Sequence, residues 1–243
     1  MHLSFSAAVS LVIFTAFPVF AAEKNDDSAS GSAVVREMNL ARQNPALYAT
    51  FVQELRSRMN GNVLVLGHTR IRTKEGTGAV DEAIRFLQNA QPLPPLTLSR
   101  GMSRAAADHC ADQADGGMGH QGKDRRLPSK RIARYGNFSG YWGENISYGK
   151  STAREVVLAL IIDDGLPARK HRANIFNPNY NFAGAAFGPH ARFRTMCSMD
   201  FAGGYAERGE AAPDTLVARN FWRLLPIGFL RPITPQFIQD RLD

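Results

Sequence analysis

Hydrophobic residues recur with helical spacing in the first part of the chain. They lie three, four or seven positions apart at Val34, Met38, Ala41, Tyr48, Val52 and Leu55. This spacing is typical of the buried face of a helix. Asn44-Pro45 lies within the run and is typical of a helix start, with asparagine as the N-cap and proline as the first helical residue. The pattern therefore predicts two consecutive helices that end near residues 59–61.

After residue 61, the spacing of hydrophobic residues is first typical of strands. Further along the chain, segments with helical spacing and segments with strand spacing follow one another. Residues 63–73 are typical of a short β-hairpin, and residues 75–78 of a turn. Further helices are predicted at residues 81–88, 98–114 and 152–162. Strands are predicted at residues 144–147, 182–187 and 194–201, the last two as an antiparallel pair. Helices followed by strands, with a helix between them, indicate an α+β layered fold.

The N-terminus has the features of a targeting signal. Residues 3–20 are mostly apolar, and no Asp, Glu, Lys or Arg precedes Glu23. Val19-Phe20-Ala21 places small residues at the two positions that a signal peptidase reads. We interpret residues 1–21 as a cleaved signal peptide, the alternative being a membrane anchor, and we expect a secreted or periplasmic protein.

The rest of the chain divides into three parts. Residues 22–32 are a polar lead-in, residues 33–205 are the predicted domain, and residues 206–243 are a C-terminal extension. The extension contains an apolar and aromatic stretch at residues 221–230 that we expect to dock on the domain. No other stretch is long and apolar enough to cross a bilayer, so the mature chain is expected to lack a transmembrane span.

Charge and cysteine content narrow the possible partners. The formal net charge is +7, which favours anionic lipids or cell-wall polymers as partners or serves solubility alone. Lysines and arginines are scattered, without the dense block typical of nucleic-acid binding, so no nucleic-acid partner is expected. Cys110 and Cys197 are the only cysteines. They form either one disulfide or two buried free thiols.

Common catalytic motifs are missing from the sequence. Residues 117–122 match G-x-G-x-x-G by spacing, but they follow a predicted helix rather than a strand, so no dinucleotide site is predicted there. The sequence contains no H-E-x-x-H, no G-x-S-x-G and no C-x-x-C. These absences leave no dedicated catalytic signature.

A set of short segments occurs in a specific order. The segments are Asn39-Leu40-Ala41-Arg42 with Asn44-Pro45, then His120, Gly143-Glu144-Asn145-Ile146, Asp163-Asp164-Gly165, His171-Arg172-Ala173-Asn174-Ile175-Phe176, Gly184 and Asp200-Phe201. This ordered set resembles the CAP (SCP/TAPS) superfamily of cysteine-rich secretory, antigen 5 and pathogenesis-related proteins, and in particular its exported bacterial members. The resemblance covers roughly residues 33–205.

The resemblance implies an α-β-α sandwich with a central antiparallel sheet and a cavity lined by two histidines and two acids. The matching histidines are His120 and His171, and the first acid is Glu144. In the family the second acid lies three positions after a residue that is usually aromatic. Leu160 occupies that aromatic position here, which places the acid at Asp163, with Asp164 as the adjacent alternative.

Other residues have supporting roles under the same resemblance. Arg172 and Asn174 are expected to brace the loop around His171. The remaining histidines do not match family positions and are expected on the surface or in packing; they are His68, His109 and His190. Residues 63–86 and residues 165–170 appear as additions relative to compact members, and the cysteine framework of the eukaryotic proteins is missing.

Two imidazoles and two carboxylates suit a divalent metal, with zinc as the leading candidate. His120 and His171 would ligate directly, while Glu144 and Asp163 would either ligate or orient a histidine through its second ring nitrogen. An open metal site would lower the pKa of a bound water molecule, which could then act as a nucleophile. This is the basis of the hypothesis that the protein is an enzyme.

Three functions follow, in decreasing order of support. The first is a secreted binding module for a lipid, a cell-wall polymer or a partner protein. The second is a structural tetrad, with the function on the surface of the protein. The third is a metal-dependent hydrolase such as a peptidase.

Overall fold

The computed structural model describes residues 30–208. The predicted signal peptide and nearly all of the predicted C-terminal extension, including residues 221–230, lie outside the described residues. The helices are α1 (Gly31–Gln43), α2 (Pro45–Ser57), α3 (Thr77–Asn89), α4 (Arg100–Gln113), α5 (Pro128–Tyr135), α6 (Ala153–Ile162) and α7 (Lys170–Ile175). The strands are β1 (Met59–Asn60), β2 (Val63–Leu66), β3 (Thr69–Arg72), β4 (Thr97–Leu98), β5 (Gly136–Tyr148), β6 (Phe182–His190) and β7 (Arg194–Glu207).

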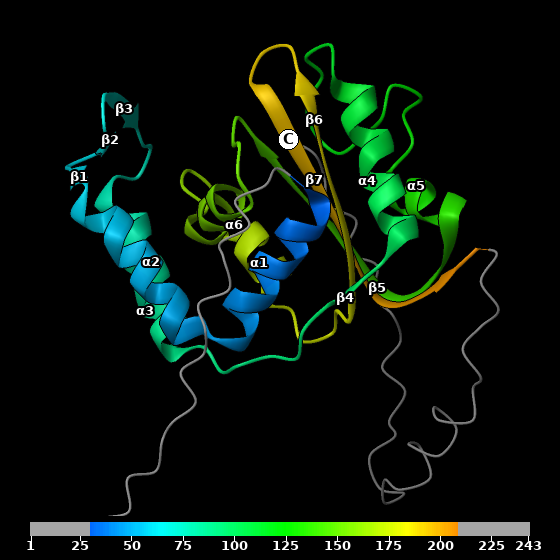
Figure 1. Cartoon of the computed structure of the whole chain (residues 1–243), viewed down its shortest axis with the longest axis horizontal. Helices are drawn as coiled ribbons and strands as arrows, with labels where there is room; N and C mark the ends of the chain where they lie inside the picture. Colours follow the sequence, from blue (N-terminus) through cyan, green and yellow to red (C-terminus); the bar gives the residue numbers. More distant parts are fainter. Residues whose placement is uncertain (1–29, 209–243) are drawn as a thin grey trace, which may run out of the picture.

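A four-stranded sheet in the order β4-β6-β7-β5 lies between two helical layers (Figure 1). The strands β5, β7 and β6 pair antiparallel, whereas the two-residue β4 pairs parallel with β6. On one face, α1, α2, α3 and α6 share an apolar core with β6 and β7. On the other face, α4 and α5 pack on β7 through Met102, Ala105, Ile132 and Ala202. The predicted α+β class and the α-β-α sandwich are therefore confirmed.

Side chains that cap the helices fix where several of them begin. Ser30 and Ser99 accept hydrogen bonds from the backbone N–H groups of Ala33 and Met102, at the starts of α1 and α4. Thr152 and Glu155 form a complete capping box at the start of α6. Each cap satisfies backbone donors that have no partner within the helix. The predicted junction of two helices at Asn44-Pro45 is also present, although the Asn44 side chain makes no capping hydrogen bond.

Two polar residues of α1 join this helix to distant loops. The Asn39 side chain donates to Leu96 O (2.9 Å) and accepts from Leu96 N (2.7 Å). The buried Arg42 guanidinium donates to the carbonyl oxygens of Pro94, Ile175, Asn177 and Tyr180. A buried cation is tolerated when such acceptors satisfy its donors. Asn39 and Arg42, which belong to the first segment of the ordered set, therefore join α1 to the chain before β4 and after α7.

Several elements differ from the sequence-based expectations. The helix expected from residue 81 begins at Thr77, because Gly76 adopts a positive φ of 64° and turns the chain directly into α3. The strand expected at residues 144–147 extends over Gly136–Tyr148, since β7 continues to Glu207 and supplies a partner along its length. Helix α5, which starts at Pro128, was not predicted because it has only eight residues and Ile132 as its one buried aliphatic residue.

The two additional segments contact each other. Residues 63–86 form β2, β3 and most of α3, with residues 63–73 folding into the predicted hairpin. The backbone N–H of Gly165 donates to Glu75 Oε1 (2.6 Å), and the carboxylate of the preceding Asp164 accepts from the backbone N–H groups of Lys74 (2.7 Å) and Glu75 (2.8 Å). Arg169 donates to both Glu75 and Glu82. The hydrogen bonds that Arg169 donates to Glu75 lower the pKa of the Glu75 carboxyl to about 2. The two additions therefore form one structural unit.

Within residues 30–208, no helix has both the length and the apolar character that crossing a bilayer requires.

Candidate functional site

Glu144 of β5 holds the ring of His120. His120 lies in the loop between α4 and α5, and its Nδ1 is 2.7 Å from Glu144 Oε1. The His120 side chain is 44% exposed, whereas that of Glu144 is 1% exposed. Because an ionised carboxylate can only accept, Nδ1–H donates to Glu144. The buried Glu144 carboxylate therefore fixes the orientation of the exposed His120 imidazole.

The buried Glu144 carboxylate is neutralised on the α4 and α5 side of the sheet. Arg131 of α5 forms an ion pair with Glu144 Oε2, and both side chains are almost fully buried. Ser198 of β7 donates from its Oγ to Glu144 Oε2 (3.2 Å). Arg131 also donates to His120 O (2.9 Å), so the same guanidinium holds the backbone and the acid that position the imidazole.

Hydrogen bonds to both the N–H and the carbonyl oxygen fix Gly119, the residue before His120. Gly119, with a φ of 90°, accepts at its carbonyl oxygen from His109 Nε2 (2.9 Å) and Gln113 Nε2 (2.5 Å). Its N–H donates to Tyr148 Oη (3.1 Å), and that hydroxyl donates to Gln113 Oε1 (2.7 Å). A positive φ is available to glycine at little cost. This network fixes the main chain from which His120 projects.

His171 and Asp163 form the second pair. His171 Nδ1 lies 2.7 Å from Asp163 Oδ1, and the backbone N–H of His171 donates to Asp163 Oδ2 (3.0 Å). Asp163 ends α6 in the left-handed conformation (φ 55°), which aspartate tolerates better than most residues. Asp163, and not the adjacent Asp164, is therefore the acid that contacts His171.

Arg172 and Asn174 lie where the sequence placed them, next to His171. Arg172 donates from Nε to Ile161 O (2.5 Å) and from Nη1 to Glu82 (2.9 Å), which ties α7 to the end of α6 and to α3. The Asn174 amide donates to Asn145 Oδ1 (2.8 Å), and Asn145 donates to His171 O (3.0 Å). The two residues brace the segment that carries His171.

The two pairs approach β5, a strand at one edge of the sheet, at neighbouring residues. Glu144 faces α4 and α5, while the neighbouring Asn145 faces α7, because successive side chains of a strand alternate between faces. Within residues 30–208, no three His, Cys, Asp or Glu side chains converge closely enough to hold a metal ion. Zinc binding by the two histidines therefore stays a prediction.

A third acid, Asp200 of β7, lies next to Glu144 on the neighbouring strand. It is opposite Glu144 in the register of β5 and β7, and it is fully buried. Burial raises the pKa of Asp200 well above its usual range, the charge of Glu144 adds to this effect, and Arg131 opposes it. The buried Asp200 carboxyl therefore favours its neutral form.

The cysteines are buried free thiols that lie on different faces of the sheet. Cys110 packs with Ile146 and Met196 on the α4 side, whereas Cys197 belongs to the core under α1 and α6. The disulfide that was one of the two alternatives is therefore not formed. Burial raises the pKa of the Cys110 thiol to about 11, which makes it a poor nucleophile.

The sequence reasoning missed Arg131 and the proximity of His109. His109 is fully buried on α4, with its Nε2 4.0 Å from Glu144 Oε1, and burial lowers its pKa below the ordinary histidine value. Its position could have been read from the apolar stripe of α4, where buried residues recur at Ala106, His109, Cys110 and Gln113. By contrast, His190 is buried in packing and His68 is exposed.

Both pairs leave the same chemical group available. With Nδ1–H donated to a carboxylate, a neutral imidazole has its lone pair on Nε2. That nitrogen can accept a hydrogen bond from a hydroxyl group, take up a proton or ligate a metal. The side chains of both histidines are partly exposed, so Nε2 chemistry is directed toward the surface rather than into the core.

The α-β-α sandwich described above is that of a CAP domain. The chain belongs to the cysteine-rich secretory protein (CAP) family, whose model matches residues 36–201. The family assignment made from the ordered set of segments is thereby confirmed.

Individual relatives are distant from this chain. The uncharacterized protein YkwD of Bacillus subtilis (strain 168) is 29% identical over 125 residues, which cover 49% of this chain and 47% of the relative. The chain therefore spans about half the length of this curated relative.

Two solved structures are similar at low identity. An extracellular protein with an SCP domain from Bacillus anthracis is 18% identical, with a TM-score of 0.37, over 45% of this chain and 34% of that one. An outer surface protein from Borrelia burgdorferi is 16% identical, with a TM-score of 0.38, over 45% of this chain and 78% of that one.

Proposed function

We propose that this CAP domain is an extracellular binding module that attaches to a hydroxyl-rich, anionic cell-wall polymer at the edge of β5. The observation that supports this most is the shared geometry of the two histidines. Each imidazole is oriented through Nδ1 by a buried carboxylate, which leaves Nε2 as a hydrogen-bond acceptor at the surface. The hydroxyl groups of a polysaccharide are matching donors.

Exposed aromatic side chains lie on the same strand. Tyr141 is 65% exposed and Trp142 is 39% exposed, next to an irregularity in the pairing of β5 with β7. Trp142 and Glu144 face the same side of β5, about 7 Å apart along the strand. Trp142 thus lies near the imidazole that Glu144 holds. An aromatic face suits the carbon skeleton of a sugar ring, and Trp also offers an N–H donor.

The net charge favours an anionic polymer. The chain carries a formal charge of +7, and attraction of this kind is long-range and weakened by salt. Binding should therefore be strongest at low ionic strength. The hydroxyl and aromatic contacts supply the part of the affinity that salt does not remove.

A structural tetrad is the second candidate, and the burial of Glu144 favours it. The Glu144 carboxylate contacts His120, Arg131 and Ser198 and is 1% exposed. In that case, loss of His120 would alter stability without altering binding. The two functions therefore predict different behaviour of the same variant.

Retention on isolated cell-wall sacculi tests the proposal. We expect the purified chain to sediment with the sacculi, and the retained fraction to fall at least about fivefold in Trp142→Ala and in His120→Ala. Leu47→Ala is the matched control, because Leu47 is also exposed (47%) and lies on α2, outside both histidine–acid pairs. Failure of the wild-type chain to sediment, or equal retention of all variants, would overturn the proposal.

Two further measurements separate the other functions. Retention on anionic lipid vesicles but not on sacculi would identify a lipid as the partner. Release of soluble wall fragments that stops in His120→Ala or on chelation would favour the hydrolase and its metal.

A further inference from the structure

A small sheet of the additional segment stands apart from the central sheet. Strands β1, β2 and β3 form it in that order, and a turn at Gly67-His68 joins β2 to β3. Figure 1 shows it at the end of α2 that is away from α1, well separated from the four-stranded sheet. We call residues 59–74, which contain these three strands, the projecting sheet.

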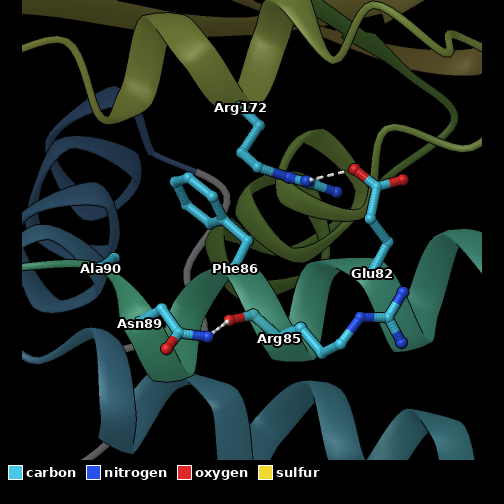
Figure 2. Close-up of a pocket in the computed structure, with 6 residues that line it drawn as sticks. All are labelled: Glu82, Arg85, Phe86, Asn89, Ala90 and Arg172. Atoms are coloured by element: carbon cyan, nitrogen blue, oxygen red, sulfur yellow. Dashed lines mark hydrogen bonds and ion pairs between the residues drawn. The ribbon is translucent and has the colours of Figure 1, made fainter.

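The base of the projecting sheet is fixed to the domain. Met59 packs against the main apolar core, and Glu75, which follows the sheet, accepts hydrogen bonds from Arg169. Figure 2 shows the Arg172 guanidinium of α7 directed toward Glu82 of α3, the helix that begins after β3, and the two are 2.9 Å apart. The sheet is therefore presented on a fixed support, which reduces the ordering that binding requires.

Aliphatic side chains lie on both faces of the projecting sheet. Residues directly opposite each other in an antiparallel pair share a face, and successive residues alternate between faces. The register therefore places Leu64, Leu66 and Ile71 on one face, and Val63 and Val65 on the other. All five are only half-buried, and in the described part of the chain none of them packs into an apolar cluster of the domain. Both faces therefore leave hydrocarbon in contact with water.

The formal charge of the projecting sheet is entirely positive. It contains two arginines and one lysine but no Asp or Glu. Arg70 lies opposite Val65 and Arg72 opposite Val63, so both arginines are on the same face. Both are exposed, and no described carboxylate forms an ion pair with either guanidinium. Such side chains cover apolar surface with their stems while the charged ends reach an anionic partner.

These features favour a fluid, anionic partner. A rigid surface covers only one face of a thin sheet, whereas the boundary between lipid headgroups and acyl chains can surround the tip and take up aliphatic side chains from both faces. Arginine pairs well with the phosphate groups of anionic lipids. Because β3 is an edge strand, Arg70 and Arg72 oppose its pairing with β3 of a second copy.

We propose that the projecting sheet docks the domain on an anionic lipid membrane, with Leu66 and the Gly67-His68 turn entering the headgroup region and Arg70 and Arg72 contacting lipid phosphates. Insertion is shallow, because the backbone groups along the outer edge of β3 require water. This surface is separate from the β5 site and does not depend on the binding function proposed above.

Co-sedimentation of the full chain with vesicles of equal parts phosphatidylglycerol and phosphatidylcholine tests the charged contacts. Binding to pure phosphatidylcholine should be at least about tenfold weaker. Arg70→Gln/Arg72→Gln should lower the partition coefficient about thirtyfold, because each arginine near an anionic surface contributes about a factor of five. The control Arg104→Gln/Arg194→Gln removes the same charge from exposed positions of α4 and β7, and should lower it by less than about threefold.

A second pair of variants tests the apolar contact. Leu66→Ser should lower the partition coefficient about tenfold, whereas Leu47→Ser, at an exposed leucine of α2, should leave it unchanged. Leu66→Met retains an apolar side chain, and Arg70→Lys/Arg72→Lys retains the charge, so both should bind nearly as wild type does. Thermal unfolding of each variant identifies any loss that comes from misfolding.

A fluorescent label provides a local measurement at the tip. His68→Cys accepts a nitrobenzoxadiazole (NBD) label at an exposed position, while Cys110 and Cys197 are buried. Its emission should shift to the blue on addition of the anionic vesicles. The same label on Ala111→Cys, at an exposed position of α4, should show no shift.

Several results would overturn the proposal. They are no binding of wild type to the anionic vesicles, equal partition coefficients of the Arg70/Arg72 and Arg104/Arg194 variants, and an unshifted label at position 68. Retention on sacculi that is lost in Leu66→Ser, without binding to vesicles, would assign the projecting sheet to the wall polymer. A dimer in solution that Leu66→Ser dissociates, again without binding to vesicles, would assign it to a second copy of the chain.

Discussion

The two histidine–acid pairs have the same contact between imidazole and carboxylate but are supported in different ways. Glu144 of β5 is buried, neutralised by Arg131 of α5 and flanked by Ser198 and Asp200 of β7. Asp163 holds His171, eight positions later in the chain, where α6 ends and α7 begins. One pair depends on the tertiary fold, and the other is built from local chain geometry.

This difference indicates how much each pair affects the stability of the fold. A carboxylate and a guanidinium that are both buried stabilise the fold only as long as both are present, since either one alone is a buried uncompensated charge. The local pair has two hydrogen bonds to one carboxylate, with α6 and α7 already adjacent. We therefore expect the Glu144 side to govern stability and the His171 side to be more tolerant of change.

Removal of Arg131 should give the largest effect. Arg131→Met leaves the Glu144 carboxylate buried without its cation, and we expect a loss of about 3–5 kcal/mol in the free energy of unfolding. Urea unfolding measures this loss. The control is Arg134→Met on the same helix, whose ion pair with Asp108 is exposed and should contribute about 0–1 kcal/mol. Equal losses in the two variants would remove the contrast between the pairs.

Substitution of Asp163 should have a smaller effect. Asp163→Asn retains tolerance of the left-handed conformation and one acceptor oxygen, so we expect a loss of about 1–2 kcal/mol. The measurement is again urea unfolding, alongside Arg131→Met. A loss as large as that of Arg131→Met would show that the second pair is also essential to the fold.

Asp200 makes the Glu144 side dependent on pH. Its pKa is raised in the folded state, so between the unfolded value near 3.9 and the folded value the native chain binds more protons than the unfolded chain. This group therefore removes stability as pH rises. Asp200→Asn lacks this contribution, so its stability relative to wild type should increase as the pH rises above about 4. Parallel stability curves for the two proteins would contradict the assignment.

The thiols provide the smallest effect, a difference in reactivity between the native and unfolded chains. Burial raises the pKa of both Cys110 and Cys197. We expect neither to react with a thiol reagent in the native chain near pH 8, and both to react in urea. Mass spectrometry without reductant provides the check, and a mass lower by two hydrogen atoms would reveal a disulfide instead.

The sequence was most informative where the signal is local. The helix junction at Asn44-Pro45, the hairpin over residues 63–73 and the start of α6 after Thr152 all follow from short-range patterns, and the structure confirms them. The full length of β5 could not be predicted, because it depends on pairing with β7, some sixty residues later in the chain.

For the site, the sequence supplied the residues but not their environment. His120, Glu144, Asp163 and His171 came from an ordered resemblance, and the two pairings appear only in three dimensions. Arg131 was missed because nothing in an eight-residue helix shows that its arginine faces a buried acid. The contact between the two additional segments, through Glu75 and Arg169, likewise requires tertiary structure.

The central claim is that both imidazoles are oriented through Nδ1, which leaves Nε2 as the functional atom. Long-range ¹H–¹⁵N spectra of the histidine rings near pH 8, where an ordinary imidazole is neutral, test it most directly. The account predicts that His120 and His171 carry their proton on Nδ1, with an unprotonated Nε2. A proton on Nε2, or tautomers averaged as in a free imidazole, would contradict it.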